Sequence, residues 1–244
     1  MPLPPPVTTT TRPASSIRLR IVATDWLAWH EQYASGSALN QRLELVRRFI
    51  RAALDAQPPG EIRVLSMCAG DGRDILGVLD GHPRATDVRA RLVEMEPVLA
   101  GRAREAVSRL GLSAIDVVTG DAGSTDAYAG IAPVNIALVC GVFGNITDDD
   151  IRATIEHLPE LCAAGAHAVW TRGTFEPDLT PQIRRWFEES SFRNLAFEGV
   201  PGTTMAAGHV VLDGLPRPYR SGVRLFEFLP DEERPSQRAI RGPA

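Results

Sequence analysis

The chain has 244 residues, of which 44% are hydrophobic, and its formal net charge at pH 7 is −4. This length and composition suffice for one domain with a substantial core, and the weak acidic charge, with arginines scattered among acids, argues against a nucleic-acid substrate. All 26 basic residues are arginine, which excludes Walker-type phosphate loops, Schiff-base catalysis and pyridoxal phosphate anchoring because each needs a lysine.

Residues 1–16 are rich in proline, threonine and serine and lack apolar periodicity, so we expect a disordered leader there and a flexible tail over 231–244. One domain is expected over 17–230. Its first part, residues 24–56, has the apolar spacing of an amphipathic helix, and the Pro-Pro-Gly sequence at 58–60 predicts its end.

Strands and helices alternate in the following segments. The predicted strands are residues 63–68, 90–94, 115–119, 134–140 and 166–172, and the predicted helices are residues 72–80, 97–110, 148–163 and 180–190. This alternation is typical of a doubly wound, mostly parallel sheet in a three-layer α/β/α fold. Three extended segments then follow, at 194–200, 208–213 and 222–229. They predict an antiparallel hairpin at the sheet edge, and the two strands of a hairpin with the five strands before it make a seven-stranded sheet.

The cysteines, the histidines and the apolar runs indicate whether disulfides, a metal site or a membrane helix are to be expected. The cysteines are Cys68, Cys140 and Cys162, an odd number without a recognisable signal peptide, so we expect no disulfide framework and a cytoplasmic location. The five histidines have no zinc-site spacing. No apolar run reaches the roughly 18 residues of a membrane helix. Neither a metal nor a membrane is therefore expected.

Residues 64–74 predict a short apolar strand that runs into a glycine-bearing turn, and this turn opens the next helix. Gly70 and Gly72 allow a ligand to approach the backbone closely. Glu94 and Glu96 follow about 20 residues later, where an acid at the end of the next strand can accept hydrogen bonds from a ribose. The pattern indicates a nucleotide-binding site.

The ordered motifs over residues 40–229 resemble those of class I S-adenosylmethionine (SAM)-dependent methyltransferases, which implies a Rossmann-like fold. In the first motif, Ser66 replaces an acid that in the family helps to order the methionine end of the cofactor, and Cys68 replaces a glycine. A thiol there is expected to require a negative φ. By resemblance, the cofactor-binding residues of this loop are Cys68, Ala69, Gly70, Gly72 and Asp74.

The second motif spans residues 92–97. Its resemblance to the family implies that Glu94 binds both ribose hydroxyls and that Met95 lies on the adenine, with Glu96 as the less favoured acid. The third motif, residues 118–122, implies that Asp121 lies beside the adenine amine and the backbone of Ala122 beside a ring nitrogen. The fourth motif implies a reaction centre lined by Cys140, Gly141, Phe143 and Asn145.

Aromatic residues gather at the start of the first helical stretch, at Trp26, Trp29, His30 and Tyr33. They either pack on the sheet or form a lid over cofactor and substrate, as N-terminal helices do in small-molecule methyltransferases. The candidate catalytic residues are His30, Tyr33 and Asn145, and the candidate substrate residues are Trp29, Tyr33, Asn145 and Arg172. Arg172 at the end of the fifth strand either pairs with an acidic substrate or has a structural role.

The resemblance implies transfer of a methyl group from SAM to an O, N or C nucleophile of a small molecule, leaving S-adenosylhomocysteine (SAH). Positioning alone can lower such a barrier by roughly 7 to 11 kcal/mol, so a catalytic base is optional. The alternatives are a SAM-binding module without methyl transfer and a nicotinamide-dependent oxidoreductase, although the G-x-G-x-x-G fingerprint of the latter is absent. A monomer or homodimer is expected.

Overall fold

The structure is a computed structural model that describes residue 33, residues 36–230 and residues 232–234. The expected leader, the aromatic residues Trp26 and Trp29, and His30 lie outside the described residues, as does most of the expected tail.

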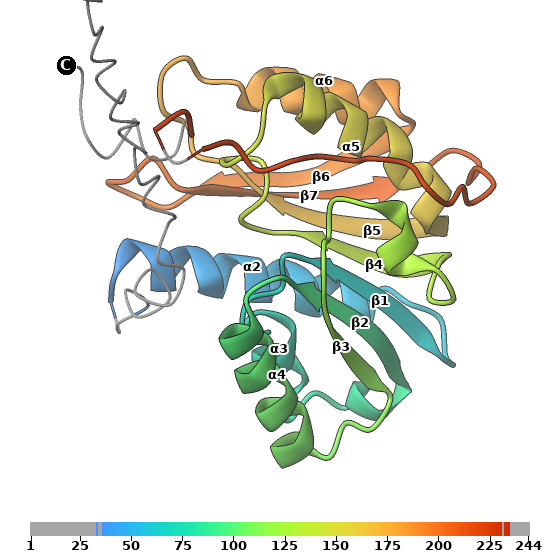
Figure 1. Ribbon diagram of the computed structural model, residues 1–244. Helices are drawn as coiled ribbons and strands as arrows, with labels where there is room; N and C mark the ends of the chain where they lie inside the picture. Colours follow the sequence, from blue (N-terminus) through green and yellow to red (C-terminus); the bar gives the residue numbers. More distant parts are fainter. Residues whose placement is uncertain (1–32, 34–35, 231, 235–244) are drawn as a thin grey trace, which may run out of the picture.

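A seven-stranded sheet forms the centre of the described chain (Figure 1). The strands are β1 (Ile62–Met67), β2 (Val88–Glu94), β3 (Ile115–Thr119), β4 (Val134–Val139), β5 (Cys162–Thr171), β6 (Phe192–Gly199) and β7 (Ala206–Leu212), in the order β3-β2-β1-β4-β5-β7-β6. The first five strands pair in parallel, while β7 pairs antiparallel with both β5 and β6. The predicted parallel sheet with an antiparallel C-terminal hairpin is confirmed.

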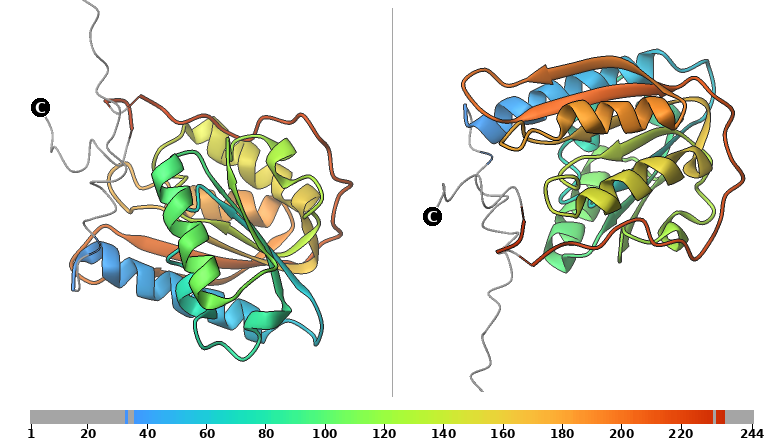
Figure 2. Two further views of the ribbon diagram at one scale, coloured as in Figure 1. Left: turned by 60° about the horizontal axis from the view of Figure 1, so that its bottom comes forward. Right: turned by 90° about the horizontal axis from the view of Figure 1, so that it is seen from above.

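Helices cover both faces of the sheet, which gives three layers (Figures 1 and 2). On one face lie α2 (Ala38–Asp55), α3 (Ile75–Leu79) and α4 (Pro97–Leu110), and on the other α5 (Asp148–Leu161) and α6 (Thr180–Glu189). Two short 3-10 helices, η1 (Ala85–Asp87) and η2 (Thr125–Tyr128), lie in connections. Ser37 and Thr147 accept hydrogen bonds from backbone amides three residues on, which caps α2 and α5.

The strand side chains alternate between the two helical layers. In β1, Leu65 and Met67 belong to the hydrophobic cluster that contains the α5 and α6 side chains, whereas Ile62 and Val64 belong to the cluster under α2, α3 and α4. This period of two is what a sheet buried on both faces requires. The strand ends are thereby fixed relative to one another.

The expected helix over 24–56 is described only from α2 onward, which begins at Ala38 after its Ser37 cap. The predicted end is close to the observed one at Asp55. Of the three expected C-terminal extended segments, the first two correspond to β6 and β7, and the third does not join the sheet.

Residues 214–230, here called the C-terminal strap, run across the molecule past α5 (Figures 1 and 2). The strap is irregular because its backbone bonds to loops rather than to a strand. The Leu225 amide donates to the Gly123 carbonyl (2.7 Å), and the Leu229 amide donates to the Asn145 carbonyl (2.9 Å). The expectation of a strand over 222–229 was wrong, since the only β-pairing of this segment among the described residues is an isolated bridge between Arg224 and Ser124.

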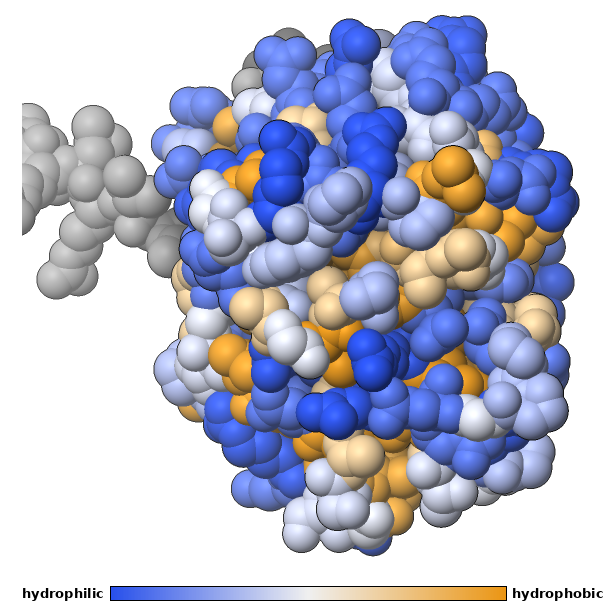
Figure 3. Space-filling model, turned by 90° about the vertical axis from the view of Figure 1, so that its right-hand side faces the viewer, coloured by the Kyte–Doolittle hydropathy of each residue, from blue (hydrophilic) through white to orange (hydrophobic). Residues whose placement is uncertain are grey.

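The surface is mixed in character. Figure 3 shows the face at the right-hand side of Figure 1, where hydrophilic residues predominate and hydrophobic ones show between them. Among the described residues, no helix combines the length and the apolar character needed to cross a bilayer.

Candidate functional site

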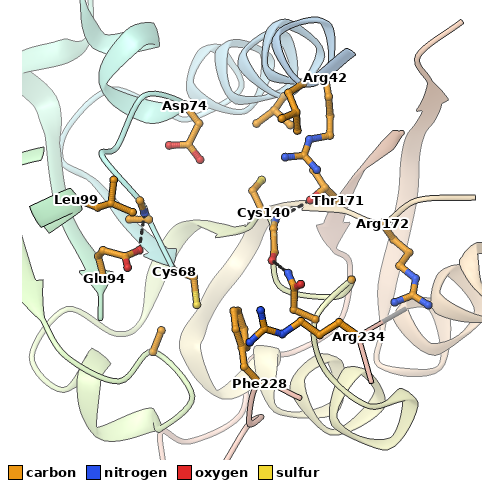
Figure 4. A pocket seen from close by; sticks show the side chains of 18 of the residues that line it. Arg42, Cys68, Asp74, Glu94, Leu99, Cys140, Thr171, Arg172, Phe228 and Arg234 are labelled. Carbon is orange, nitrogen blue, oxygen red and sulfur yellow. Dashed lines mark hydrogen bonds between the residues drawn. The ribbon is translucent and has the colours of Figure 1, made fainter. Parts of the chain in front are cut away.

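A cavity of about 650 Å³ opens at the carboxyl ends of β1, β2, β4 and β5 (Figure 4). The strand order reverses between β1 and β4, and such a switch point is where open α/β sheets bind ligands. The first turns of α2 form one wall, and residues of the C-terminal strap form another. A volume of this size holds a ligand of several hundred daltons.

The loop after β1 provides the floor through Cys68, Ala69 and Gly70. Cys68 has a φ of +52°, which corrects the expectation of a negative φ. The backbone thus keeps the left-handed conformation that favours glycine, at a cost of about 1 to 2 kcal/mol for a side-chain-bearing residue.

Gly72 does not line the cavity. Its φ is +74°, and a Cβ there would lie 2.8 Å from a side-chain carbon of Leu76 and 3.0 Å from one of Leu92. Its amide donates to the Ala69 carbonyl (2.9 Å). Gly72 therefore serves the turn and the close approach of helix to sheet, rather than ligand contact.

Glu94 joins the loop after β1 to the end of β2. Its Oε2 accepts a hydrogen bond from the Gly70 amide (2.7 Å), and its Oε1 accepts one from the Glu96 amide (2.8 Å). The carboxylate is buried yet lines the cavity. Next to it, the apolar side chain of Met95 is 64% exposed at the cavity rim. The two residues present a carboxylate and an uncovered apolar surface side by side.

Asp121 lies at the same end of the cavity, after β3. Its Oδ1 accepts from the Gly123 amide (2.7 Å), and its Oδ2 forms an ion pair with Arg224 of the C-terminal strap. The hydrogen bond to Asp121 raises the pKa of Arg224. Ala122 also lines the cavity. The ion pair thus joins the strap to Asp121, the acid that the third sequence motif identified.

Above the loop, Tyr33 contacts two arginines. Arg42 of α2 donates from Nη2 to the Tyr33 hydroxyl (3.1 Å), and the guanidinium carbon of Arg73 lies 4.3 Å from the Tyr33 ring centroid. Burial raises the pKa of Tyr33 above its usual 10, so the hydroxyl stays protonated at neutral pH. All three residues line the cavity.

Asp74 faces the cavity from the start of α3. Its Oδ1 accepts from the Ile75 amide (2.7 Å), which caps the helix. Burial raises the pKa of Asp74 to about 6, and the negative charge of Asp71 adds to the rise. Figure 4 shows Asp74 and Arg42 on opposite sides of the cavity, with both charged groups directed into it.

The loop after β4 forms the end of the cavity that the fourth motif identified. Cys140, Gly141 and Asn145 line it, and the Asn145 side-chain amide donates to the Gly141 carbonyl (2.6 Å). Phe143, which was expected to line the reaction centre, does not line the cavity. Its ring is fully buried in the core, 6.1 Å from the Trp170 ring and 6.4 Å from the Phe187 ring between centroids. Only its backbone carbonyl faces a site residue, as the acceptor from Arg172.

Arg172 lines the cavity from the end of β5 and is only 5% exposed. Its Nη1 donates to the Phe143 carbonyl, and its guanidinium carbon lies 4.8 Å from the Phe175 ring centroid. Its Nε has no hydrogen-bond partner among the described residues. Burial lowers the pKa of Arg172, and Asp148 and Asp178 act against this effect.

Two groups of lining residues were not identified from the sequence. The first comes from α2, and the second comes from the strap and the residues after it: Leu39, Arg42, Leu43, Val46, Arg224, Phe226, Phe228 and Arg234. Arg234 is 7% exposed, donates from Nε to the Leu229 carbonyl (2.7 Å), and lies 5.6 Å from the Phe228 ring centroid. The apolar stripe of α2 and the arginines beside phenylalanines near the C-terminus were the available signals.

The sequence model of a protein family described as "Putative methyltransferase" matches residues 36–187. The match runs from the start of α2 into α6 and so includes the loop after β1, the β2 end and the loop after β4. The search of curated proteins finds no significant match.

Solved structures share the fold at low sequence identity. Magnesium protoporphyrin IX methyltransferase from Synechocystis PCC 6803, with bound SAM, has a TM-score of 0.60 and 11% identity, over 77% of this chain and 91% of that chain. The 1,6-didemethyltoxoflavin-N1-methyltransferase of Burkholderia thailandensis, with bound 1,6-didemethyltoxoflavin and SAH, has a TM-score of 0.58 and 14% identity, over 77% of this chain and 81% of that chain. The CurJ carbon methyltransferase has a TM-score of 0.59 and 15% identity, over 78% and 59%.

Proposed function

Since the chain belongs to this methyltransferase family, we propose that it transfers a methyl group from SAM to an oxygen, nitrogen or carbon nucleophile of a small molecule. The neighbouring structures with bound SAM or SAH support the cofactor, and the toxoflavin enzyme supports a small-molecule substrate. The cavity's own residues provide the stronger support.

The chemistry of the cavity wall fits an adenosyl group. Glu94 uses one lone pair on each oxygen for the Gly70 and Glu96 amides, and a carboxylate has further acceptor sites for two ribose hydroxyls. The exposed Met95 side chain can cover one face of an adenine ring, which removes apolar surface from water. Asp121 stands near this end as an acceptor for an exocyclic amine.

The opposite end fits the amino-acid part of SAM. Asp74 and Arg42 face one another across the cavity, as an ammonium and a carboxylate group would require (Figure 4). Ser66, which stands in the place of the family's acid, is buried and does not line the cavity. We infer that Asp74 takes over the contact with the ammonium group, since at pH 7.5 its carboxyl is mostly ionised.

Bound SAM supplies a methyl group on a positively charged sulfur, a good leaving group. The residues of this chain then have to position the acceptor and exclude water. Leu39, Leu43 and Val46 of α2 provide apolar wall for that purpose. Tyr33, with its raised pKa, can donate a hydrogen bond but is not a base at neutral pH, and the amide of Asn145 can only orient the acceptor. His30 lies outside the described residues.

The observation that carries the proposal is the buried Glu94 carboxylate, held between the loop after β1 and the β2 end, beside an uncovered Met95. Calorimetric titration with SAM, SAH and NAD tests it. We expect SAM and SAH to bind and NAD not to bind. Glu94→Gln should weaken SAH binding at least tenfold, because a charge-assisted hydrogen bond contributes about 1.5 to 3 kcal/mol.

Glu61→Gln is the matched control, since Glu61 is exposed and pairs with Arg63 two residues on. It should bind SAH as the wild type does. Binding of NAD in place of SAH would favour the oxidoreductase alternative. SAM binding without turnover on any acceptor would favour the module that binds but does not transfer.

A further inference from the structure

Acidic and basic side chains face one another across part of the cavity. Figure 4 shows Asp74 and Glu94 on one side, and Arg172 and Arg234 on the other. On the acidic side, Arg73 pairs with Asp71 and Arg224 pairs with Asp121, and Glu227 of the strap also lines the cavity. The acidic side coincides with the groups assigned above to the cationic and hydroxyl-bearing parts of SAM. The side with Arg172 and Arg234 has no counterpart in the cofactor. A second, negatively charged molecule is what this side of the cavity complements.

Arg172 is held rigidly on this side. Its Nη1 bonds to the Phe143 carbonyl and its plane lies over the Phe175 ring, while no carboxylate lies within ion-pair distance among the described residues. Its Nε is shielded from solvent and has no hydrogen-bond partner among the described residues. The carboxylates of Asp148 and Asp178 act on Arg172 only from beyond ion-pair distance. Burying a cation with such distant partners is costly, and an anion placed on its cavity side offsets that cost.

Arg234 is brought to the same side by a series of hydrogen bonds. The Asn145 side chain donates to the Gly141 carbonyl, the Leu229 amide donates to the Asn145 carbonyl, and Arg234 Nε donates to the Leu229 carbonyl. Arg234 is thereby coupled to the loop after β4, where the methyl acceptor has to lie. Its guanidinium also contacts the Phe228 ring.

We propose that the methyl acceptor is a small carboxylic acid whose carboxylate is held on the arginine side of the cavity by Arg172 and Arg234, with its organic body against Phe175 and Phe228. This inference rests on the proposed function and names the substrate class of the same site. A carboxylate fits because a guanidinium presents paired donors that match its two oxygens. The two rings give a planar, apolar body a surface to cover.

The test titrates the SAH-saturated protein with benzoate and with benzamide, its neutral counterpart of the same shape. Benzoate should bind at least tenfold more tightly. Arg234→Gln and Arg172→Gln should each weaken benzoate binding at least tenfold, as expected for one charge-assisted contact. Arg152→Gln, which removes an exposed α5 arginine paired with Glu156, should leave it unchanged.

SAH affinity is measured for every variant and should stay at the wild-type value, which also shows that each variant is folded. Arg234→Gln is the safer variant because Arg234 follows the strap, whereas Arg172 supports the loop after β4. Benzamide binding equal to benzoate, or full benzoate binding by Arg234→Gln, overturns the inference. Tighter binding of phenyl phosphate than of benzoate overturns the assignment of a carboxylate.

Failure of the proposed function would look different. If SAH does not bind to the wild type, the titration is repeated on the protein alone. Benzoate binding that Arg234→Gln abolishes would then still support the arginine site, and its absence would overturn it.

Discussion

Two buried histidines make the stability of this fold sensitive to mild acid. His167 on β5 and His209 on β7 form a hydrogen bond between Nδ1 and Nε2 at 2.8 Å, and they are 8% and 5% exposed. The Phe49 ring of α2 lies 5.5 Å from the His209 ring. Burial, and secondly the positive charge of Arg193, lower the pKa of His167. A proton added to the pair places a positive charge in an apolar layer, and a second proton would set two N–H groups against each other.

The magnitude follows from the pKa of His209. Burial, with a smaller contribution from His167, lowers it from the usual 6.5 to about 4. The unfolded chain therefore binds a proton below pH 6.5 that the folded protein does not bind until about pH 4, so stability falls as the pH falls through this window. At about 1.4 kcal/mol per pH unit, the loss reaches about 2 kcal/mol at pH 5 and about 3 kcal/mol at pH 4.

Urea denaturation of the wild type and His209→Gln at pH 7.5 and pH 5 measures this effect. Glutamine can bond to His167 Nδ1 but does not titrate. Between the two pH values, the wild type should lose about 2 kcal/mol more free energy of unfolding than the variant. Because the variant keeps every other titrating group, the difference belongs to position 209. Equal losses in the two proteins would refute the reasoning.

Two further predictions concern the loop after β1. Cys68 has a φ of +52°, a conformation that glycine adopts without strain. The Cys68→Gly variant should therefore have a free energy of unfolding about 1 kcal/mol higher than that of Cys68→Ala. Equal stability of the two variants would show that the conformation is not strained. Asp74→Asn keeps a side-chain cap on α3 and removes a carboxyl whose pKa burial raises to about 6. Above this pH the folded protein has to hold the ionised carboxylate in its buried place, which lowers the free energy of unfolding of the wild type. The variant should be more stable than the wild type by about 1 to 2 kcal/mol at pH 8 and no more stable at pH 4, and a gain that does not change with pH in chemical denaturation would contradict this.

The alternating strands and helices could be predicted because each element carries its own periodicity. Strand β1 and helix α4 have short, regular apolar patterns, and their observed bounds lie within a residue of those expected. The motif order also located the cavity, since carboxyl ends of parallel strands meet at one edge of a sheet whatever the packing details.

The features that depend on distant contacts could not be predicted. Residues 222–229 alternate like a strand, but their amides bond to loops such as that at Gly123. Phe143 stands in the expected motif, yet its ring turns into the core toward Trp170 because the backbone direction of the loop decides which side chains face the cavity. The pairing of His167 with His209 needs the register of β5 against β7, which the sequence does not state.

The C-terminal strap also sets the order in which the site can come into being during synthesis. Arg224 closes on Asp121 from 103 positions further along the chain, and Arg234 follows later still. When all seven strands of a nascent chain have emerged from the ribosome, the cavity still lacks the wall that the strap forms. The sheet, with Glu94, Met95 and Asp74 already in place, can thus assemble before the strap arrives, and the wall formed by the strap and Arg234 is the last part of the cavity to form.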